Sequence, residues 1–236
     1  LKPITKFCKQ ITNPNSIKYY LDKAFYETTN SRPGPIYLEI PLDIQSAKFN
    51  IKKYKTFLPK KEKVNKLNLQ LIKKYLNKSS RPIILLGNGI NVAQQSTKIK
   101  QIIKKLKIPT LTTQLGKAAM EYENNFFIGH SGPKGDRAGN LAVQNSDFIL
   151  VLGSSLASQT IGWEHDKFSP NSFKIQIDPD KSILKKNKLI NLKINSDLKF
   201  AIKDLKKIVL KKDFTEWHKK CLKWKKKYQI ILEPHV

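Results

Sequence analysis

The chain has 236 residues, of which 39% are hydrophobic, and it carries a formal net charge of +27 at pH 7. This length allows one core of ordinary domain size and part of a second. No apolar run approaches the roughly 20 residues that cross a bilayer, and the first ten residues lack the apolar centre of a signal peptide. We therefore expect a soluble protein without a membrane span.

The positive charge invites a nucleic-acid interpretation, but its distribution argues against one. Only three of the 45 basic residues are arginines, although base readout and planar phosphate recognition favour arginine. Residues 181–236 hold 17 lysines against 5 acidic residues, whereas residues 110–165 hold 3 basic and 5 acidic residues. We expect solvated lysine faces on helices and no specific nucleic-acid partner, with nucleic-acid binding as a minor alternative.

The cysteines and the methionine bear on where the protein is located and on whether the chain is part of a longer one. Cys8 and Cys221 lie far apart without a second cysteine or histidine at ligand spacing, which predicts neither a disulfide framework nor a zinc site. A cytoplasmic location follows by default. Because Met120 is the only methionine, we expect Leu1 not to be a translation start and the chain to be processed or part of a longer protein.

The first 80 residues are expected to form the end of one domain and a connection. A helical pattern over residues 15–30 precedes a turn and an alternating strand at 36–40. One face of this helix would carry Ile17, Tyr20, Leu21 and Ala24. We assign residues 1–45 to a partial α/β domain and residues 46–79 to a basic linker that passes into an amphipathic helix.

Residues 80–209 alternate short β-rich apolar runs with helical patterns, which is typical of parallel βαβ units. Helices are expected over 94–107 and 136–146, the second opened by Asp136 as a cap and carrying Ala138, Leu141 and Ala142 inward. The fold class expected is α/β, with a doubly wound, mostly parallel Rossmann-like sheet of about six strands. The expected strands are 82–87, 109–113, 147–153, 173–178 and 189–194, with a weaker one at 125–129.

The last part of the chain reads as two helices and an exit. Residues 196–212 form the first pattern, and a basic helix with Trp217 and Trp224 seven residues apart forms the second. We expect residues 210–236 to lead toward a further domain.

Glycine-rich turns follow two of the expected strands and suggest a ligand site. Gly87, Asn88 and Gly89 follow the first central strand, and Gly153 and Ser154 follow the fourth. Glycines there let backbone amides and a helix N-terminus approach a phosphate at the edge where parallel strands end. The third glycine of the dinucleotide fingerprint is missing, so an ordinary tight turn explains each turn about equally well.

Three other residues have both a binding and a structural interpretation. Asp178 could accept a ribose hydroxyl or could form an Asx turn before Pro179. His130 and Arg137 could bind an anion, although lone residues of this kind are more often structural. No nucleophile elbow, H-E-x-x-H or P-loop pattern occurs. The residues alone therefore predict a nucleotide-sized crevice without a catalytic set.

An ordered set of motifs covers essentially the whole chain and resembles the thiamine-diphosphate-dependent acetolactate synthase family (acetohydroxyacid synthase large subunit). The motifs are KPITK (2–6), RPGPIYLEIPLDIQ (32–45), RPIILLGNGI (81–90), IPTLTTQLGK (108–117), GDRAGNLAVQNSDFILVLGSSL (135–156) and IDPDK (177–181). The resemblance implies that residues 1–45 end a pyrimidine-binding domain, that 80–209 are the central domain, and that 210–236 lead toward a pyrophosphate-binding domain.

The resemblance also implies a parent enzyme, a lyase or transferase that uses thiamine diphosphate and Mg²⁺ on a 2-keto acid and forms a homodimer or homotetramer. The family's activating glutamate would lie before Leu1, and its Gly-Asp-Gly…Asn magnesium motif after Val236. Catalytic and metal residues are therefore expected to be absent from this chain, which alone should be inactive. The alternative is a free-standing nucleotide-binding or scaffold module with the same sheet.

Departures from the family pattern bear on the central domain's own ligand. Relatives that hold FAD carry G-x-R-F/L-D-D-R where residues 153–159 read GSSLASQ, and I-D-I-D-P where residues 175–179 read IQIDP. Ser155, Ala157, Ser158 and Gln159 cannot make the charge-assisted bonds of that motif. We expect no FAD. An ADP-like nucleotide remains possible along Gly87, Asn88, Gly89, Gly116, Gly153, Ser154 and Asp178.

Overall fold

The computed structural model describes residues 1–59 and 67–229 of the chain, which divides into two compact units, Leu1–Lys63 and Val64–Val236. The predicted linker over 46–79 includes residues 60–66, and the predicted exit over 210–236 includes residues 230–236. Both stretches lie outside the described residues. The four predicted domain ranges stay predictions.

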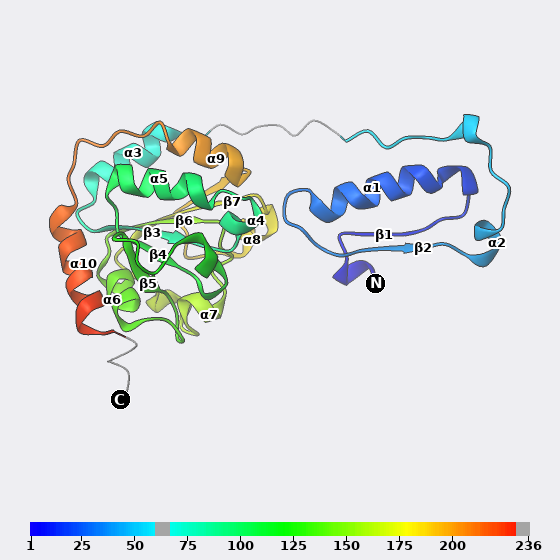
Figure 1. The fold of residues 1–236 in the computed structure, drawn as a ribbon. Helices are drawn as coiled ribbons and strands as arrows, with labels where there is room; N and C mark the ends of the chain where they lie inside the picture. The colour runs from blue at the N-terminus through cyan, green and yellow to red at the C-terminus, as the bar shows by residue number, and fades with distance from the viewer. Residues whose placement is uncertain (60–66, 230–236) are drawn as a thin grey trace. The chain divides into compact units, whose positions relative to one another are not determined.

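The first unit is built on a two-stranded parallel sheet with one long helix (Figure 1). Phe7 pairs with Ile36 and Gln10 with Glu39. The elements are η1 (Lys2–Ile4), β1 (Phe7–Gln10), η2 (Pro14–Ser16), α1 (Ile17–Thr29), β2 (Ile36–Glu39), α2 (Leu42–Gln45) and η3 (Ile51–Lys53).

Packing on α1 in this first unit is partial. Of the four residues expected to share one face of α1, Ala24 is buried, Ile17 and Tyr20 are half-buried, and Leu21 is 39% exposed. The two short strands cover only part of this face. Tyr20 stacks on Phe7 of β1, with ring centroids 6.3 Å apart.

The second unit contains a six-stranded, all-parallel sheet in the order β5-β4-β3-β6-β7-β8. Strands are added to one side of β3 and then, after a crossover, to its other side, so the predicted doubly wound sheet is confirmed. The strands are β3 (Pro82–Leu86), β4 (Thr110–Thr112), β5 (Phe127–His130), β6 (Phe148–Leu152), β7 (Phe173–Asp178) and β8 (Leu192–Asn195).

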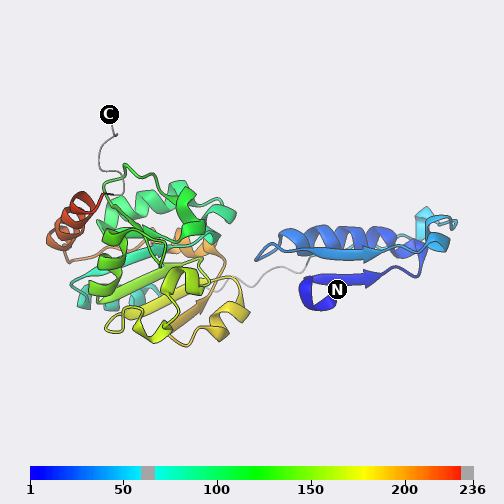
Figure 2. The same ribbon diagram turned by 90° about the horizontal axis from the view of Figure 1, so that it is seen from below.

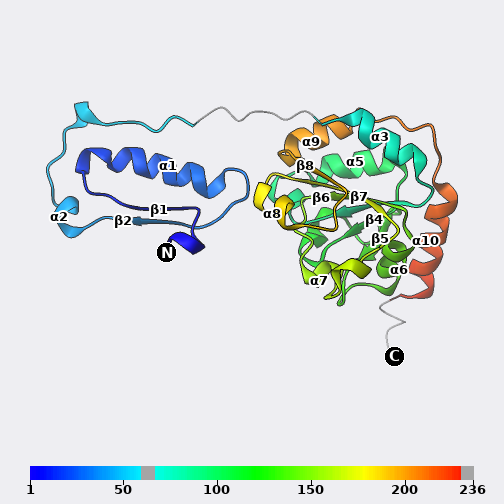
Figure 3. The same ribbon diagram turned by 180° about the vertical axis from the view of Figure 1, so that it is seen from behind.

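Helices cover both faces of this sheet, as Figures 1 and 3 show: α3, α5 and α9 lie on one side, and α6 and α7 on the other. The view in Figure 2 shows α10, in red, at the outside of the unit. The bounds are α3 (Leu69–Lys78), α4 (Gly89–Val92), α5 (Ser96–Leu106), η4 (Gln114–Ala119), α6 (Arg137–Asn145), α7 (Ser158–Ile161), η5 (His165–Lys167), α8 (Lys181–Lys186), α9 (Leu198–Leu205) and α10 (Thr215–Lys227).

The burial pattern explains why the central strands are continuous apolar runs. Ile84 and Leu86 face the core under α3, α5 and α9, while Ile83 and Leu85 face the core over α6 and α10. Each side chain removed from water in this way stabilises the fold by about 1.5–3 kcal/mol. Parallel sheets of this kind are buried on both faces, which is the signal that made the strands predictable.

Two details of α6 differ from expectation. Asp136 lies at the N-cap position, but its side chain makes no cap hydrogen bond, because its Oδ2 accepts the backbone N–H of His130 at 2.7 Å. Leu141 is half-buried, whereas Val143 is fully buried in the core shared with α10. The inner face is thus rotated toward α10, which packs beside α6.

Candidate functional site

Three turns meet at the carboxyl edge of the six-stranded sheet, the edge where its parallel strands end. A Cβ on Gly87, after β3, would lie 2.1 Å from the carbonyl oxygen of Gly153, after β6. A Cβ on Gly116, in η4 after β4, would lie 2.6 Å from the carbonyl oxygen of Leu86. The structure therefore brings together the glycines that were predicted to share one edge. They lie at the point where the strand order reverses, which is where ligands bind in open α/β sheets.

The amides of these glycines are already used inside the protein. Gly87 N–H donates to Leu152 O at 2.8 Å, and Gly89 N–H donates to Gly153 O at 2.9 Å. Gly116 N–H and Gly153 N–H are likewise bonded, to Thr113 O and Ile177 O. The glycines thus serve close backbone packing between turns. A diphosphate would have to be met by other donors.

Two described backbone amides at this edge, unlike those of the glycines, are not used in hydrogen bonds inside the protein. Within the described part of the chain, the backbone N–H groups of Asn88 and Ser154 have no hydrogen-bond partner. Asn88 lies at the start of α4, and Ser154 is the second residue after the end of β6. The crevice therefore offers two backbone donors, one on each side of the β3–β6 junction.

Asp178 lies at the same edge, at the end of β7, and is buried. Its Oδ1 accepts the backbone N–H of Asp180 at 2.9 Å, and the Asn195 side chain donates to Asp178 O and to Pro179 O. This is the geometry of the Asx-turn interpretation. The ribose-binding role of Asp178 stays a prediction.

His130 and Arg137 are held in contacts of their own. His130 ends β5, two strands away from β3, and its Nδ1 lies 2.6 Å from Thr112 Oγ1. Burial lowers the pKa of His130, against the opposing charge of Asp136 and with help from Lys117. The guanidinium of Arg137 lies 4.6 Å from the ring centroid of Tyr228 on the chain beyond α10. The structure does not bring these two residues to the glycine turns.

Residues 69–205, more than half of the chain, match the family model described as "Thiamine pyrophosphate enzyme, central domain". The chain belongs to the thiamine pyrophosphate enzyme family. The match begins with the first residue of α3 and ends with the last of α9, so it takes in the whole six-stranded sheet of this central domain.

Curated relatives of this thiamine pyrophosphate enzyme chain carry the name acetolactate synthase large subunit. The Cyanidium caldarium protein is 28% identical over 99% of the chain, and the Lactococcus lactis protein is 30% identical over 98%. A probable acetolactate synthase large subunit of Methanocaldococcus jannaschii is 31% identical over 86% of the chain. The chain spans 42%, 41% and 35% of these relatives, respectively.

Potential metal ligands do not cluster in the part of this family member that the structure describes. Within residues 1–59 and 67–229, no group of three or more His, Cys, Asp or Glu side chains could hold a metal ion. In the same part of the chain, every helix is too short or too polar to cross a membrane.

Gln176, which sequence reasoning did not select, organises the turn after β6 in the central domain. The residue lies in the middle of β7, is fully buried, and its Nε2 donates to Ser154 O at 2.7 Å. Its Oε1 accepts from Asn187 Nδ2 at 2.8 Å, and Asn187 also donates to Ser155 O at 3.2 Å. The polar residue itself was the available signal, because such a group must find partners when buried; Lys174 and Asp178 of β7 carry the same signal.

The segment that replaces the arginine- and aspartate-rich motif packs against the loop after β5. A Cβ on Gly132 would lie 2.1 Å from Gln159 O, and Ser131 Oγ donates to Thr160 O at 2.9 Å. Ser158 Oγ lies 3.0 Å from His165 Nε2. Short neutral side chains therefore line this stretch, and they bond locally.

Proposed function

We propose that the chain is part of a thiamine-diphosphate- and Mg²⁺-dependent enzyme that acts on a 2-keto acid by decarboxylation or carboligation, and that residues 80–209 are its non-catalytic central domain. The observation that carries this is the family match over the complete sheet of the second unit, together with acetolactate synthase relatives aligned along nearly the whole chain. Thiamine diphosphate supplies the electron sink for the substrate carbanion in such enzymes.

The first unit supports an assignment to the end of a pyrimidine-binding domain. Parallel strands are normally covered on both faces, yet β1 and β2 form a pair beside a single long helix. Phe25 and Leu42 are 75% and 79% exposed there. Apolar surface of this kind fits a sheet that is completed by further strands, and assembly into a homodimer or homotetramer in the cytoplasm is part of the same proposal.

The crevice at the carboxyl edge is proposed to take an ADP-like nucleotide weakly and no FAD. Asn88 and Ser154 offer backbone donors to a diphosphate, and Asp178, at the end of β7, is the proposed acceptor of a ribose hydroxyl. Ser155, Ala157, Ser158 and Gln159 provide no charged group for a flavin linker. Purified parent protein should be colourless, and flavin absorbance at near-unit occupancy would contradict this part.

One comparison tests the enzyme assignment. The gene on both sides of this segment is sequenced, and its full product is assayed with a panel of 2-keto acids in the presence of thiamine diphosphate and Mg²⁺. We expect an upstream glutamate-bearing domain, a downstream Gly-Asp-Gly…Asn motif and measurable turnover. The 236-residue chain alone should show neither turnover nor stoichiometric cofactor binding by calorimetry. A start codon beside Leu1 and a stop after Val236 would favour the free-standing module instead.

A further inference from the structure

A pocket opens at the edge of the sheet opposite the glycine turns, where the strands begin. Its volume is about 270 Å³, slightly below the range of roughly 300–1,000 Å³ typical for drug-sized ligands. It lies between the C-terminal end of α5 and the segment that joins α9 to α10. We call it the amino-edge pocket, and its lining residues are Lys105, Leu106, Lys107, Ile208, Val209, Leu210, Lys211, Lys212 and Asp213.

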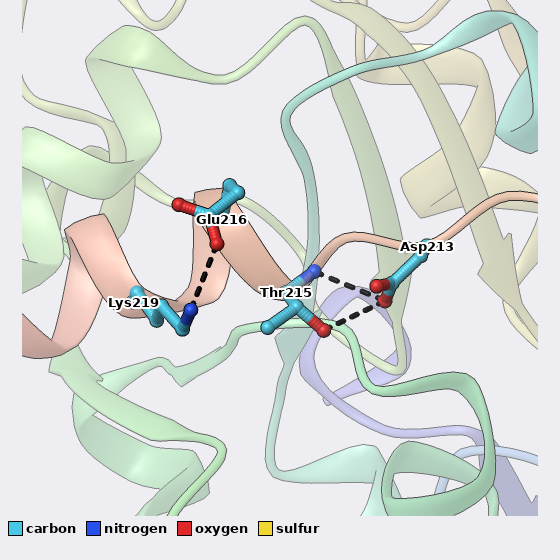
Figure 4. Close-up of polar contacts among 4 residues, drawn as sticks. All are labelled: Asp213, Thr215, Glu216 and Lys219. Carbon is cyan, nitrogen blue, oxygen red and sulfur yellow. Dashed lines mark hydrogen bonds and ion pairs between the residues drawn. The ribbon is translucent and has the colours of Figure 1, made fainter.

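Four lysines and one aspartate line the amino-edge pocket, and the aspartate is bonded to Thr215 while it feels the charge of Lys107. Asp213 Oδ1 accepts the backbone N–H and the hydroxyl of Thr215 at 3.1 and 2.7 Å, as Figure 4 shows. The hydroxyl bond leads the causes that lower the pKa of Asp213, so the carboxylate stays ionised and bound. The next acidic residue, Glu216, pairs with Lys219 at 2.9 Å.

Only some of the lysine ammonium groups of the pocket have hydrogen-bond partners. Lys105 Nζ donates to Lys206 O at 2.9 Å, and Lys212 Nζ donates to Ser80 Oγ at 3.3 Å. Within the described residues, the ammonium groups of Lys107 and Lys211 make no hydrogen bond, and the charge of Lys107 helps to lower the pKa of Asp213. Positive charge therefore remains unbalanced in a concave surface.

The backbone at Lys107 holds a cation where glycine would be easier to accommodate. Lys107 is the C-cap of α5 with φ 53° and ψ 36°, in the left-handed region. A non-glycine residue there costs about 1–2 kcal/mol, and glycine is the usual choice at such helix ends. The chain carries this cost and gains a lysine in the wall of the pocket.

The pocket also has an apolar part. Leu106 and Ile208 already pack in the core, whereas Leu210 is half-buried and Val209 is 61% exposed. An inorganic ion would leave the Val209 side chain uncovered, whereas an organic phosphate would cover it.

We propose that the amino-edge pocket binds a small phosphorylated metabolite. Lys107 and Lys211 hold the phosphate, with Lys105 and Lys212 adding charge, and the organic part lies on Val209 and Leu210. Lysine binds phosphate as a point charge, which suits four flexible side chains around one anion.

The test uses the 236-residue chain and two probes, phenyl phosphate and inorganic phosphate, titrated by calorimetry at physiological salt to screen diffuse attraction. The double variant Lys107→Gln/Lys211→Gln is compared with Lys74→Gln/Lys98→Gln, which removes equal charge from exposed positions of α3 and α5. We expect one saturable site that binds phenyl phosphate more tightly than phosphate. The pocket variant should weaken phenyl phosphate binding by roughly tenfold or more, since each charged hydrogen bond contributes about 1.5–3 kcal/mol.

Equal weakening in both double variants, or binding that does not saturate, would overturn the proposal. Equal affinity for the two probes would remove the organic ligand from it. Circular dichroism checks that the variants fold. If the substitution at Lys107 disturbs α5, the single variant Lys211→Gln, in an irregular segment, is used in its place and should still lose affinity relative to Lys98→Gln.

Discussion

Replacing Gln176 by methionine should destabilise the second unit, although methionine is apolar and the position is fully buried. Methionine has a similar volume, so the change chiefly removes two hydrogen bonds, those to Ser154 O at 2.7 Å and from Asn187 at 2.8 Å. A buried acceptor left without a partner costs about 1–3 kcal/mol. Asn187 keeps its bond to Ser155 O and is half-buried, so its loss is smaller. We expect a total of roughly 2–4 kcal/mol.

The assay is urea unfolding of the 236-residue chain followed by tryptophan fluorescence. All three tryptophans, Trp163, Trp217 and Trp224, belong to the second unit, so the signal reports on that unit alone. In thermal unfolding the same loss corresponds to about 2–4 °C per kcal/mol for a unit of this size. The matched control is Gln101→Met on the exposed side of α5, expected within about 0.5 kcal/mol of wild type.

A second substitution at the same position adds a pH dependence. In Gln176→Glu the ionised carboxylate cannot donate to Ser154 O, whereas the protonated form can. Burial raises the folded pKa of the introduced carboxyl above its unfolded value, so its stabilising protonated form is present at low pH and is lost as pH rises through the folded pKa. The stability gap to wild type should widen from pH 5 to pH 8. A loss in Gln176→Met no larger than in the control, or a gap that narrows with pH, would refute the role given to Gln176.

Three further predictions concern the same unit. Gly153→Ala should lower the free energy of unfolding by more than about 2 kcal/mol, because the new Cβ would lie 2.6 Å from a Leu198 methyl group and φ is +62°. Gly162→Ala has φ at +87° but nothing within 4 Å of the new Cβ, so it should cost only about 1 kcal/mol. Trp217→Phe should lower the free energy of unfolding by about 1–3 kcal/mol, because the buried carbonyl of Pro82 at the start of β3 loses its hydrogen bond. Trp163→Phe, at a side chain that is 84% exposed, should change it by less than about 0.5 kcal/mol. Both values are read from denaturation midpoints followed by circular dichroism. Burial lowers the pKa of Lys174, so between its folded and unfolded pKa values the unfolded chain binds more protons and stability rises with pH. Urea midpoints from pH 7 to 10 should therefore rise less in Lys174→Met than in wild type. The same rise of the midpoint with pH in both proteins would contradict the lowered pKa of Lys174.

The strands were predictable because burial on both faces produces short runs of apolar residues that are visible in the local sequence. The run at residues 82–87 is apolar at every position, and the structure buries all of β3. The order of the strands has no such local pattern, because it depends on which strands pair after the crossover at α6. Asp136 illustrates the limit at a single residue: its capping position is evident in the chain, but its side chain is taken by the backbone of His130.

The glycine turns show the same division within the candidate site. Their place at one edge follows from the alternation of strands and helices. Whether their amides are available to a ligand depends on neighbours far along the chain, as when Gly89 donates to Gly153. Gln176 could not be assigned a role either, because its partner Ser154 belongs to another strand's turn.

The position of β3 at the middle of the sheet has a consequence for biosynthesis. Its two neighbours are β4 and β6, and Pro82 pairs with Phe148, so the ladder on the β6 side forms only after a long stretch of chain has left the ribosome. Until then one edge of a fully apolar strand has its backbone groups unpaired, and such edges promote association with other chains. Slow translation between β3 and β6 would lengthen this exposure of the unpaired strand edge.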